Sequence, residues 1–497
     1  METTLIVFFL VLPLALAAVL PLLGRLSKRV LPDILANAVF FVLVVNAFVL
    51  GRRIPAGEPL ILQASWFGEP LGLRMAVDNF SLFLLLAVAL VSLCVGLYSI
   101  SYMEHFGSKP AYYALLLIMV AGMNGLILST DLFGIYVFLE VAAVASYALV
   151  AFGLGRDEVE AAFKYLMLSV AASAFILISI AVIFFMTGSL ALSDVARSLA
   201  AMDAGPVVAV CSALFLMGFG LKAALIPFHA WLPDAHPSAP APISAMLSGL
   251  LIKVSGVYAM TRIFFHVFGL TPALSMVLMI LGSVSIVLAA FLALGQKDLK
   301  RMLAYSSISQ VGYVVLGLGL GTPLGIIGGL FHLFNHALAK GLLFLNSGSI
   351  QSAAGTRNLD EMAGLARRMP VTAVTSLVGS LSIAGVPPLN GFWSKLIIII
   401  ALVQAGQGGF ALIAVLASIL TLWYYLLFQR KAFFGKPEER WKDIREAPFW
   451  MTASTVVLAL LCIGVGIFFS PVVAAWIEPA AGVLGKGIQF VLGAWGL

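Results

Sequence analysis

Five charged residues lie deep inside otherwise apolar stretches of the sequence: Glu140, Lys222, Lys253, Lys340 and Lys395. Carboxylates and amines take up and release protons, and buried groups of this kind mark proton relays in membrane proteins. A charge at the centre of a bilayer costs about 2.5 to 3.5 kcal/mol even on lenient insertion scales. We therefore interpret these five residues as the candidate functional groups of the protein.

Two histidines precede one of the lysines at intervals of four residues, in the order His332, His336 and Lys340. This spacing places the three side chains on one helix face, about 6 Å apart per step, a gap that one water molecule can bridge. The two histidines could instead ligate a metal or haem, but no CxxC or HExxH motif accompanies them. We therefore interpret the three residues as a proton wire and expect no metal or other cofactor in this chain.

The elements that must hold these residues are membrane-spanning helices. Hydrophobic residues make up 62% of the 497 residues and charged residues only 10%, whereas soluble domains contain about 45 to 50% apolar residues. The chain divides into about fourteen apolar stretches long enough to cross a bilayer. We therefore predict an all-α polytopic membrane protein. The expected spans lie near 2–24, 31–51, 79–100, 111–130, 132–153, 161–187, 206–227, 240–264, 272–294, 302–320, 323–352, 371–405, 408–430 and 449–477.

The formal net charge of +6 could suggest a nucleic-acid partner, but the cations are distributed as in a membrane protein. Loops on one side of the expected spans are poor in Lys and Arg, and loops on the other side are rich in both. The positive-inside rule makes the rich side cytoplasmic, so we expect both termini outside a bacterial or archaeal cytoplasmic membrane and no nucleic-acid partner. The cations assigned to the poor side are Arg52, Arg53, Arg74, Arg197, Arg262 and Lys486. Those assigned to the rich side include Lys28, Arg29, Lys109, Lys300, Arg301 and Arg357.

Prolines interrupt two of the expected spans, one at Pro227 and Pro233 and the other at Pro387 and Pro388. Proline lacks a backbone N–H and clashes with the preceding turn, so each span is predicted to be a discontinuous helix. Broken helices at corresponding positions in two halves are typical of transporters built from inverted repeats. We therefore predict two inverted five-helix repeats, each with a broken helix. The predicted units are 1–110 (helices 1–3), 111–265 (first repeat), 266–431 (second repeat) and 432–497 (cytoplasmic loop, helix 14 and C-terminal tail).

Four segments around these residues carry a resemblance. They are DLFGIYVFLE (131–140), HAWLPDAHPSAPAPISAMLSGLLIK (229–253), HLFNHALAKGLLFLNSGSI (332–350) and AGVPPLNGFWSK (384–395). Over about residues 75–430 the chain resembles the antiporter-like membrane subunits shared by respiratory complex I, Mrp-type sodium/proton antiporters and energy-converting membrane-bound hydrogenases. The resemblance implies a proton-translocating subunit of a multi-subunit complex in the lipid bilayer. The implied partners are other membrane subunits, including further antiporter-like subunits, and in redox-linked members hydrophilic Fe–S subunits.

The resemblance also implies roles for the buried residues. Glu140 and Lys222 are expected to form an ion pair whose making and breaking controls protonation, although a static buried pair is the structural alternative. Lys253 resembles the central relay group, and Lys395 resembles the terminal group that connects to the opposite side. The positions that match the eleventh span of the family are His332, His336 and Lys340.

Lys395 departs from one branch of the family. The M-type subunit of complex I typically has glutamate at the matching position, whereas lysine resembles the D-type subunit of Mrp antiporters or the related hydrogenase subunit. Two interpretations therefore stay open, a redox-coupled proton-pumping subunit and the D-type subunit of an Mrp Na⁺/H⁺ antiporter without a redox link. A structural scaffold and a stand-alone solute transporter are the weaker alternatives. The chain has no GxGxxG, Walker sequence or Cys cluster, so redox chemistry is expected in partner subunits.

Other polar residues have a structural alternative to a functional role. His229 and His236 lie in the Pro-rich segment at the cytoplasmic edge of the seventh span, where capping and loop packing compete with a role in proton uptake. Asp78 and Asp131 begin spans and are predicted to be helix N-caps or interfacial charges. His266 falls at the edge of a span and is expected to be solvated.

Overall fold

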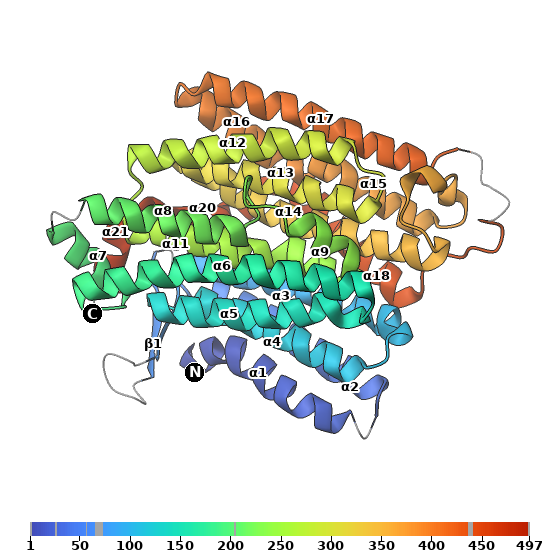
Figure 1. Cartoon of the computed structure of the whole chain (residues 1–497), viewed down its shortest axis with the longest axis horizontal. Helices are drawn as coiled ribbons and strands as arrows, with labels where there is room; N and C mark the ends of the chain where they lie inside the picture. Colours follow the sequence, from blue (N-terminus) through green and yellow to red (C-terminus); the bar gives the residue numbers. More distant parts are fainter. Residues whose placement is uncertain are drawn as a thin grey trace.

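The protein is a bundle of long helices (Figure 1). The structure, a computed structural model, describes residues 2–24, 27–55, 57–64, 73–202, 205–435 and 441–495. Within these ranges, 13 helices are long and apolar enough to cross a membrane, which confirms the predicted all-α membrane fold. They are α1 (Glu2–Leu23), α2 (Val30–Gly51), α3 (Asn79–Tyr102), α4 (Lys109–Leu128), α5 (Leu132–Val150), α6 (Arg156–Thr187), α8 (Gly205–Lys222), the continuous helix Ala241–His266, α12 (Pro272–Leu294), α13 (Leu299–Gly319), α14 (Pro323–Ala354), α17 (Gly408–Ala432) and α18 (Phe449–Ile467).

The predicted break at Pro387 and Pro388 separates two half-helices. α15 (Pro370–Ala384) ends at Gly385, whose φ of +87° suits glycine and whose N–H donates to the Leu381 carbonyl at 3.1 Å. α16 (Asn390–Gln404) begins after the two prolines. Each half-helix has 15 residues, so the two together are long enough for one more crossing. The structure thus agrees with the expected number of spans.

The other predicted break follows α8, which ends at Lys222. Residues 223–231 are not helical, and Pro227 lies among them. The indole N–H of Trp231 donates to the Leu221 carbonyl at 2.9 Å, which holds this segment against the end of α8. Pro233 does not break a helix, contrary to the prediction. It lies in the first turn of the short helix α9 (Leu232–Ser238), where the missing N–H has no helical partner to lose.

The span after α9 contains a wide helical segment that was not predicted. It consists of α10 (Ala241–Met246), a π-helix (Leu247–Tyr258) and α11 (Ala259–His266). π-Helical turns are rare and frequently occur at functional sites. This one carries Lys253 near its centre, so the lysine lies on a wider turn than the 3.6-residue period implies.

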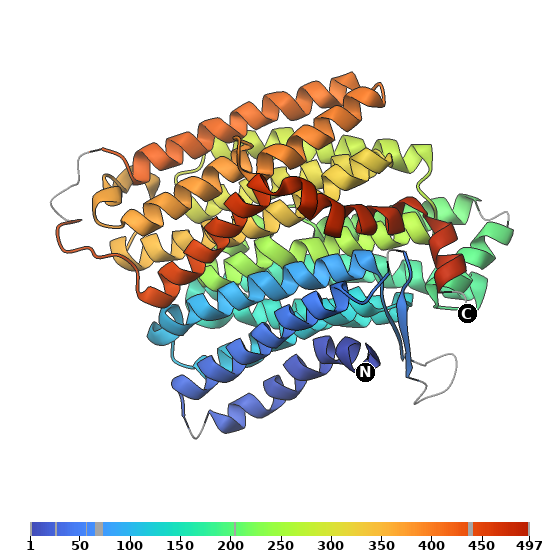
Figure 2. The ribbon, with the colours of Figure 1, turned by 180° about the vertical axis from the view of Figure 1, so that it is seen from behind.

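Several smaller elements were also missed. Strands β1 (Leu60–Ala64) and β2 (Leu73–Val77) form an antiparallel hairpin, and α7 (Leu192–Ala201) is a short amphipathic helix. The last predicted span, 449–477, is instead a chain of α18, α19 (Phe469–Val472), a π-helical turn (Val473–Ile477) and α20 (Glu478–Gly485). It continues into α21 (Ile488–Ala494) and crosses the bundle in Figure 2. The short 3₁₀-helices are Met103–His105, Ala151–Gly153, Leu359–Glu361 and Leu365–Arg367.

Both chain termini lie at the end of the bundle that also carries β1 and α7 (Figure 1). We call this end the hairpin end, and we call the opposite end, where α6 and α13 begin and α14 finishes, the α9 end. Termini at one end agree with the expected even number of crossings. The compartment that each end faces and the division into two repeats stay predictions.

Helices α12 and α13 pack backbone to backbone through two glycines. A Cβ atom at Gly312 would lie 2.6 Å from the Gly282 carbonyl oxygen, and a Cβ atom at Gly282 would lie 2.8 Å from the Gly312 carbonyl oxygen. Lipid tails are as apolar as the helices, so close van der Waals packing of this kind drives helix association in membranes. The two glycines therefore set the distance between these helices.

We expect Gly312→Ala to destabilise the protein, because the added methyl group must push α12 away from α13. Overpacking of this kind costs about 1 to 3 kcal/mol. Scanning calorimetry of the purified complex should show a lower unfolding temperature for this variant. Gly464→Ala in α18 is the control, because nothing lies within 4 Å of its added Cβ atom. Equal unfolding temperatures for the two variants would contradict the prediction.

Candidate functional site

Glu140 on α5 and Lys222 at the end of α8 form an ion pair, with Lys222 Nζ 3.2 Å from Glu140 Oε1. Lys222 Nζ also donates to the Ser169 hydroxyl at 2.6 Å, and the Ser173 hydroxyl donates to the same Glu140 oxygen. Lys222 is buried, whereas the Glu140 side chain is 26% exposed. Both charged groups therefore keep a hydroxyl neighbour on α6 when the pair separates.

Lys253 is fully buried in the π-helix and has no carboxylate within ion-pair distance in the described part of the chain. Its Nζ donates to the carbonyl of Ser248, five residues earlier, at 2.5 Å. The Ser248 hydroxyl lies 2.7 Å from the Ser307 hydroxyl on α13. A Cβ atom at Gly256 would lie 2.5 Å from the Ala223 backbone, so the π-helix packs directly on the break that follows α8.

His332, His336 and Lys340 follow one face of α14, as their spacing predicts. The two imidazole rings are nearly parallel, with centroids 6.3 Å apart. Lys340 Nζ donates to the Tyr425 hydroxyl at 2.9 Å and to the Leu303 carbonyl at 3.0 Å. His336 is fully buried, and neither of its ring nitrogens bonds to another described residue. Such groups are usually satisfied by ordered water, so this face is suited to a water-linked wire.

Lys395 on α16 lies beside the second break. Its Nζ is 3.5 Å from the carbonyl oxygen of Ala384, the last residue of α15, and 4.7 Å from the ring centroid of Tyr313. The hydroxyl of the neighbouring Ser394 lies 3.0 Å from His332 Nδ1. A carbonyl at an open helix end and an aromatic face both stabilise a cation without a carboxylate. The break itself thus supplies part of the surroundings of this lysine.

An amide pair that the sequence analysis missed joins α14 to both half-helices. Asn335 Nδ2 donates to the Asn390 carbonyl at 2.9 Å, and Asn390 Nδ2 donates to Asn335 Oδ1 at 3.0 Å. The Ser382 hydroxyl of α15 donates to Asn390 Oδ1 at 2.5 Å. Asn335 lies immediately before His336 in the sequence, and its polarity within an apolar span was a usable signal. The pair fixes the break next to the histidine face.

The central and terminal groups are close enough to act on one another. Lys340 lies within the electrostatic reach of both Lys253 and Lys395. His336 is influenced electrostatically by Lys253, Lys340 and Lys395. Glu140 and Lys222 form a separate pair beside this group. The structure therefore brings most of the predicted relay residues together and places the ion pair next to them.

The two histidines of the Pro-rich segment occupy different surroundings. His236 is fully buried and stacks on Phe344, with ring centroids 4.4 Å apart. Neither of its ring nitrogens bonds to another described residue, and it lies within the electrostatic reach of Lys253 and Lys340. His229 is only half-buried. His236 thus adjoins the central lysines, and a role in proton uptake stays a prediction for both histidines.

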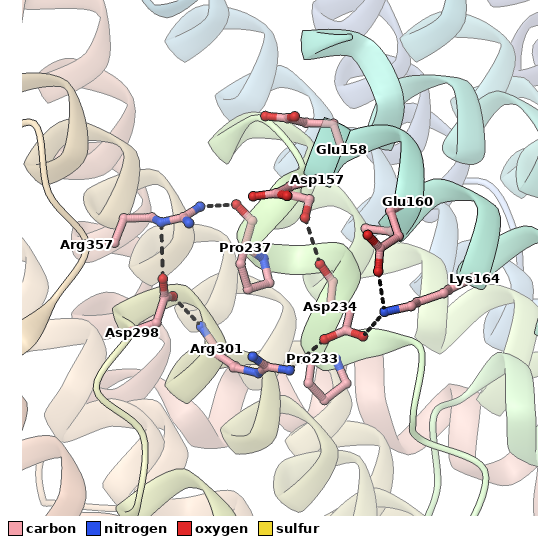
Figure 3. Close-up of a pocket in the computed structure, with 12 residues that line it drawn as sticks. Asp157, Glu158, Glu160, Lys164, Pro233, Asp234, Pro237, Asp298, Arg301 and Arg357 are labelled. Atoms are coloured by element: carbon pink, nitrogen blue, oxygen red, sulfur yellow. Dashed lines mark hydrogen bonds and ion pairs between the residues drawn. The ribbon is translucent and has the colours of Figure 1, made fainter. Parts of the chain in front are cut away.

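Charged side chains line a cavity of about 300 Å³ over α9 (Figure 3). Asp234 on α9 accepts hydrogen bonds from Arg301 Nη2 at 2.6 Å and from Lys164 Nζ at 3.4 Å. Arg357 Nε lies 3.1 Å from Asp298 Oδ2. Exposed ion pairs contribute little to stability because water screens their charges. Together they link α6, α9 and α13 on the outer side of the helix that carries His236.

A loop at the α9 end is held by a second group of ion pairs. Lys431 Nζ lies 2.5 Å and Lys297 Nζ 3.2 Å from the carboxylate of Asp360. Lys431, and after it Lys297, hold the pKa of Asp360 below its ordinary value. The stabilising effect of these pairs is therefore present at neutral pH and is lost as the pH falls through that lowered pKa.

Three cations that the sequence analysis assigned to loops are buried: Lys109, Arg262 and Lys300. Lys109 at the start of α4 pairs with Asp33 of α2 at 2.7 Å. The Lys300 ammonium donates to the Ala239 carbonyl at 2.9 Å. The loop assignment was wrong because hydropathy locates the ends of a span but not the neighbouring elements that cover its first and last turns.

The third buried cation, Arg262, pairs with Asp78 at 2.7 Å. Asp78 also caps α3, and Asp131 caps α5, so both predicted N-caps are confirmed. His266 is fully buried, which contradicts the expectation that it is solvated. The last turn of this span is therefore enclosed by protein.

We expect Glu140 and Lys222 to be thermodynamically coupled. In a double-mutant cycle with Glu140→Gln and Lys222→Met, the coupling energy should be about 0.5 to 3 kcal/mol, because each single change leaves one charge without its partner. Scanning calorimetry of the purified complex measures it. The control is the exposed pair Glu160 and Lys164 on α6, 2.9 Å apart, whose coupling should be much weaker because water screens both charges. A value for the buried pair no larger than that of the control would contradict the coupling.

Comparison with known proteins identifies the family. A family model described as "NADH:quinone oxidoreductase/Mrp antiporter, TM" matches residues 129–421, and one described as "NADH-Ubiquinone oxidoreductase (complex I), chain 5 N-terminus" matches residues 68–113. NADH-quinone oxidoreductase subunit N of Desulforudis audaxviator is 35% identical over 476 residues, which cover 93% of this chain and 94% of that protein. The D subunit of the Na(+)/H(+) antiporter of Alkalihalophilus pseudofirmus is 32% identical over 400 residues, 80% of this chain and 81% of that protein.

Comparison with solved structures finds relatives of the same kind. A chain in the structure of the Mrp complex from Dietzia sp. DQ12-45-1b superimposes with a TM-score of 0.90 and 29% sequence identity, covering 99% of both chains. That structure is a multi-subunit membrane complex, which supports other membrane subunits as partners. The chain belongs to the family of antiporter-like membrane subunits that NADH:quinone oxidoreductases and Mrp antiporters share.

Proposed function

We propose that this subunit carries protons across the membrane along its buried lysines and histidines. The observation that supports this proposal best is the enclosure of Lys253, Lys340 and Lys395 without a carboxylate at ion-pair distance in the described part of the chain. A buried ammonium group without a partner is costly, so a neutral amine that accepts a proton only in passing suits these positions.

The neighbours of these amines suit proton exchange. Lys222 contacts the Ser169 hydroxyl, Lys340 contacts the Tyr425 hydroxyl, and His332 contacts the Ser394 hydroxyl beside Lys395. Hydroxyl groups both donate and accept hydrogen bonds, so each can pass a proton between an amine and water. Glu140 is the one acidic member of the site. Its approach to Lys222 favours the charged amine, and its withdrawal releases the proton onward.

We infer that the α9 end faces the cytoplasm, so that both termini lie outside. The buried cations Lys109, Arg262 and Lys300 do not bear on orientation, yet the remaining described cations still favour this side. At the α9 end they are Lys28, Arg29, Arg156, Lys164, Lys297, Arg301, Arg357, Arg367, Arg368, Arg430, Lys431, Lys442 and Arg445. At the hairpin end they are Arg52, Arg53, Arg74, Arg197 and Lys486.

The driving force has two candidates. The greater sequence identity of the NADH-quinone oxidoreductase relative favours a redox-driven pump with hydrophilic Fe–S subunits among its partners. The relative from the Na(+)/H(+) antiporter, the fold of the Mrp chain and the lysine at position 395 favour exchange against a sodium gradient. We place the redox-driven pump first and the sodium-linked antiporter second.

We expect Lys253→Met to abolish proton transport without preventing assembly, because it removes the central amine and leaves an apolar side chain of similar length. The native complex, purified and reconstituted in vesicles, should show wild-type subunit composition and no change of internal pH when it is driven. Lys297→Met is the control, since that side chain is 76% exposed at the α9 end. Assembly lost together with transport would favour a scaffold, and full transport by Lys253→Met would refute the relay.

The same vesicles separate the two driving forces. Internal pH that changes only when an electron donor and acceptor are supplied indicates a redox pump, and mass spectrometry should then find hydrophilic Fe–S subunits in the complex. Internal pH that instead follows an imposed sodium gradient indicates an antiporter. Transport of an organic solute by the isolated chain would contradict both.

Two adjacent tyrosines provide a matched test of the residues beside the lysines. The hydroxyls of Tyr424 and Tyr425 both lie within 2.9 Å of the Ser306 hydroxyl, but only the Tyr425 hydroxyl accepts a hydrogen bond from Lys340. A hydrogen bond to a charged group contributes about 1.5 to 3 kcal/mol, so Tyr425→Phe should slow transport by about tenfold to a hundredfold. Tyr424→Phe should have little effect. Equal effects would exclude the Tyr425 hydroxyl as a specific partner of Lys340.

A further inference from the structure

A second group of buried charges lies near the hairpin end and takes no part in the relay described above. Arg262 Nη2 is 2.7 Å from each carboxylate oxygen of Asp78 and 2.8 Å from the Ser81 hydroxyl, and Arg262 Nε donates to the Tyr258 hydroxyl at 2.9 Å. The two charged side chains are 1% and 0% exposed. The pair is therefore fully hydrogen-bonded and enclosed by protein.

The C-terminal segment covers this pair. The guanidinium lies 4.8 Å from the ring centroid of Phe80 and 5.1 Å from that of Trp495, which follows α21. Arg262 Nη1 lies 3.2 Å from His266 Nδ1, and His266 Nε2 lies 3.2 Å from the Val483 carbonyl oxygen of α20. Figure 2 shows how α18 to α21 reach the hairpin end from the opposite end of the bundle.

These contacts determine which atoms of the cluster carry hydrogens. A guanidinium only donates, so His266 Nδ1 must accept from it, and His266 Nε2 then carries the hydrogen that points to Val483. Arginine stays charged in proteins and cannot hand on a proton. The Tyr258 hydroxyl donates to the Ile127 carbonyl at 2.8 Å. The side-chain nitrogens and oxygens of Asp78, Arg262, His266 and Tyr258 therefore already have hydrogen-bond partners within the protein.

The cluster lies on the same helix as the central relay group. Arg262 is on the same continuous helix as Lys253, nine residues closer to the hairpin end, which corresponds to roughly 13 Å along the axis. A proton that left Lys253 toward the hairpin end would have to pass the level of the helix at which this cluster lies. Fixed positive charges of this kind exclude protons and cations from membrane pores.

We propose that the cluster formed by Asp78, Arg262 and His266 is an electrostatic seal that keeps a proton on Lys253 from leaving directly to the hairpin end. This proposal rests on the proposed proton relay through Lys253. Asp78 compensates the guanidinium charge well enough for burial, and the guanidinium itself cannot take up or release a proton. The seal thereby directs protons from Lys253 toward the α14 face and Lys395.

The competing interpretation is a structural anchor, and the chain contains a matched control for it. Asp33 and Lys109 form another buried pair at the same distance of 2.7 Å, with side chains 10% and 4% exposed. This pair joins α2 to α4 near the α9 end and is not on the Lys253 helix. If both pairs are structural anchors, removing either pair should have the same effect on proton leak. If the Asp78–Arg262 pair is a seal, only its removal should increase the leak.

The test measures passive proton leak. The purified complex is reconstituted in liposomes without a driving reaction, a pH gradient is imposed with the membrane potential clamped, and the decay of internal pH is followed. Asp78→Asn combined with Arg262→Gln should speed the decay about tenfold or more, because both charges are removed at similar size. Adding Lys253→Met should return the decay close to the wild-type rate. Asp33→Asn combined with Lys109→Gln should leave the decay unchanged.

Three other outcomes would contradict the proposed seal. An unchanged leak in the Asp78 and Arg262 double variant, a leak that Lys253→Met does not suppress, or an equal leak in the control variant all assign the pair to the structural anchor. Failure of the relay itself is recognised separately, because Lys253→Met alone would then leave driven transport intact. Size-exclusion chromatography before reconstitution restricts the comparison to assembled complexes.

Discussion

The cost of placing polar groups where water is scarce governs this structure. Every backbone break inside the bundle must find its hydrogen bonds within the protein. At the second break, Asn390 and Asn335 exchange amide hydrogen bonds, and Ser382 completes the set. At the first break, the indole N–H of Trp231 donates a hydrogen bond to the Leu221 carbonyl in the last turn of α8. The broken helices are possible only because neighbouring helices supply these partners, and the open carbonyls that remain become part of the surroundings of the buried lysines.

The same cost divides the buried charges into two kinds. Arg262 with Asp78 and Lys109 with Asp33 are closely paired, and they lie at the ends of the bundle. Removing one partner of such a pair leaves a buried charge without compensation, which is strongly destabilising. The paired side chains therefore hold a fixed geometry. Lys253, Lys340 and Lys395 contact carbonyls, a hydroxyl and an aromatic ring instead. Partners of that kind leave the amine able to change its protonation state, so rigid and exchangeable charges occupy different places in one fold.

The features that sequence reasoning could predict are those that depend on local properties. Hydropathy located the spans, proline located both breaks, and the spacing of His332, His336 and Lys340 set their common face. The pairing of Arg262 with Asp78 joins residues 184 positions apart, and no local pattern encodes it. The π-helix around Lys253 was missed for a related reason. The segment packs on the α8 break at Gly256 and Ala223, residues 33 positions apart, and no local pattern encodes that contact.

The position of the rigid pairs relative to the exchangeable amines bears on how a proton path acquires direction. A line of amines joined by water conducts equally well both ways, because each group can accept from either neighbour. Direction requires that one way out be closed and that one group change its partner during the cycle. Glu140 beside Lys222 is suited to the second requirement, since it is partly exposed and has a serine ready as an alternative partner. The buried, permanently charged guanidinium of Arg262 on the Lys253 helix is suited to closing one way out.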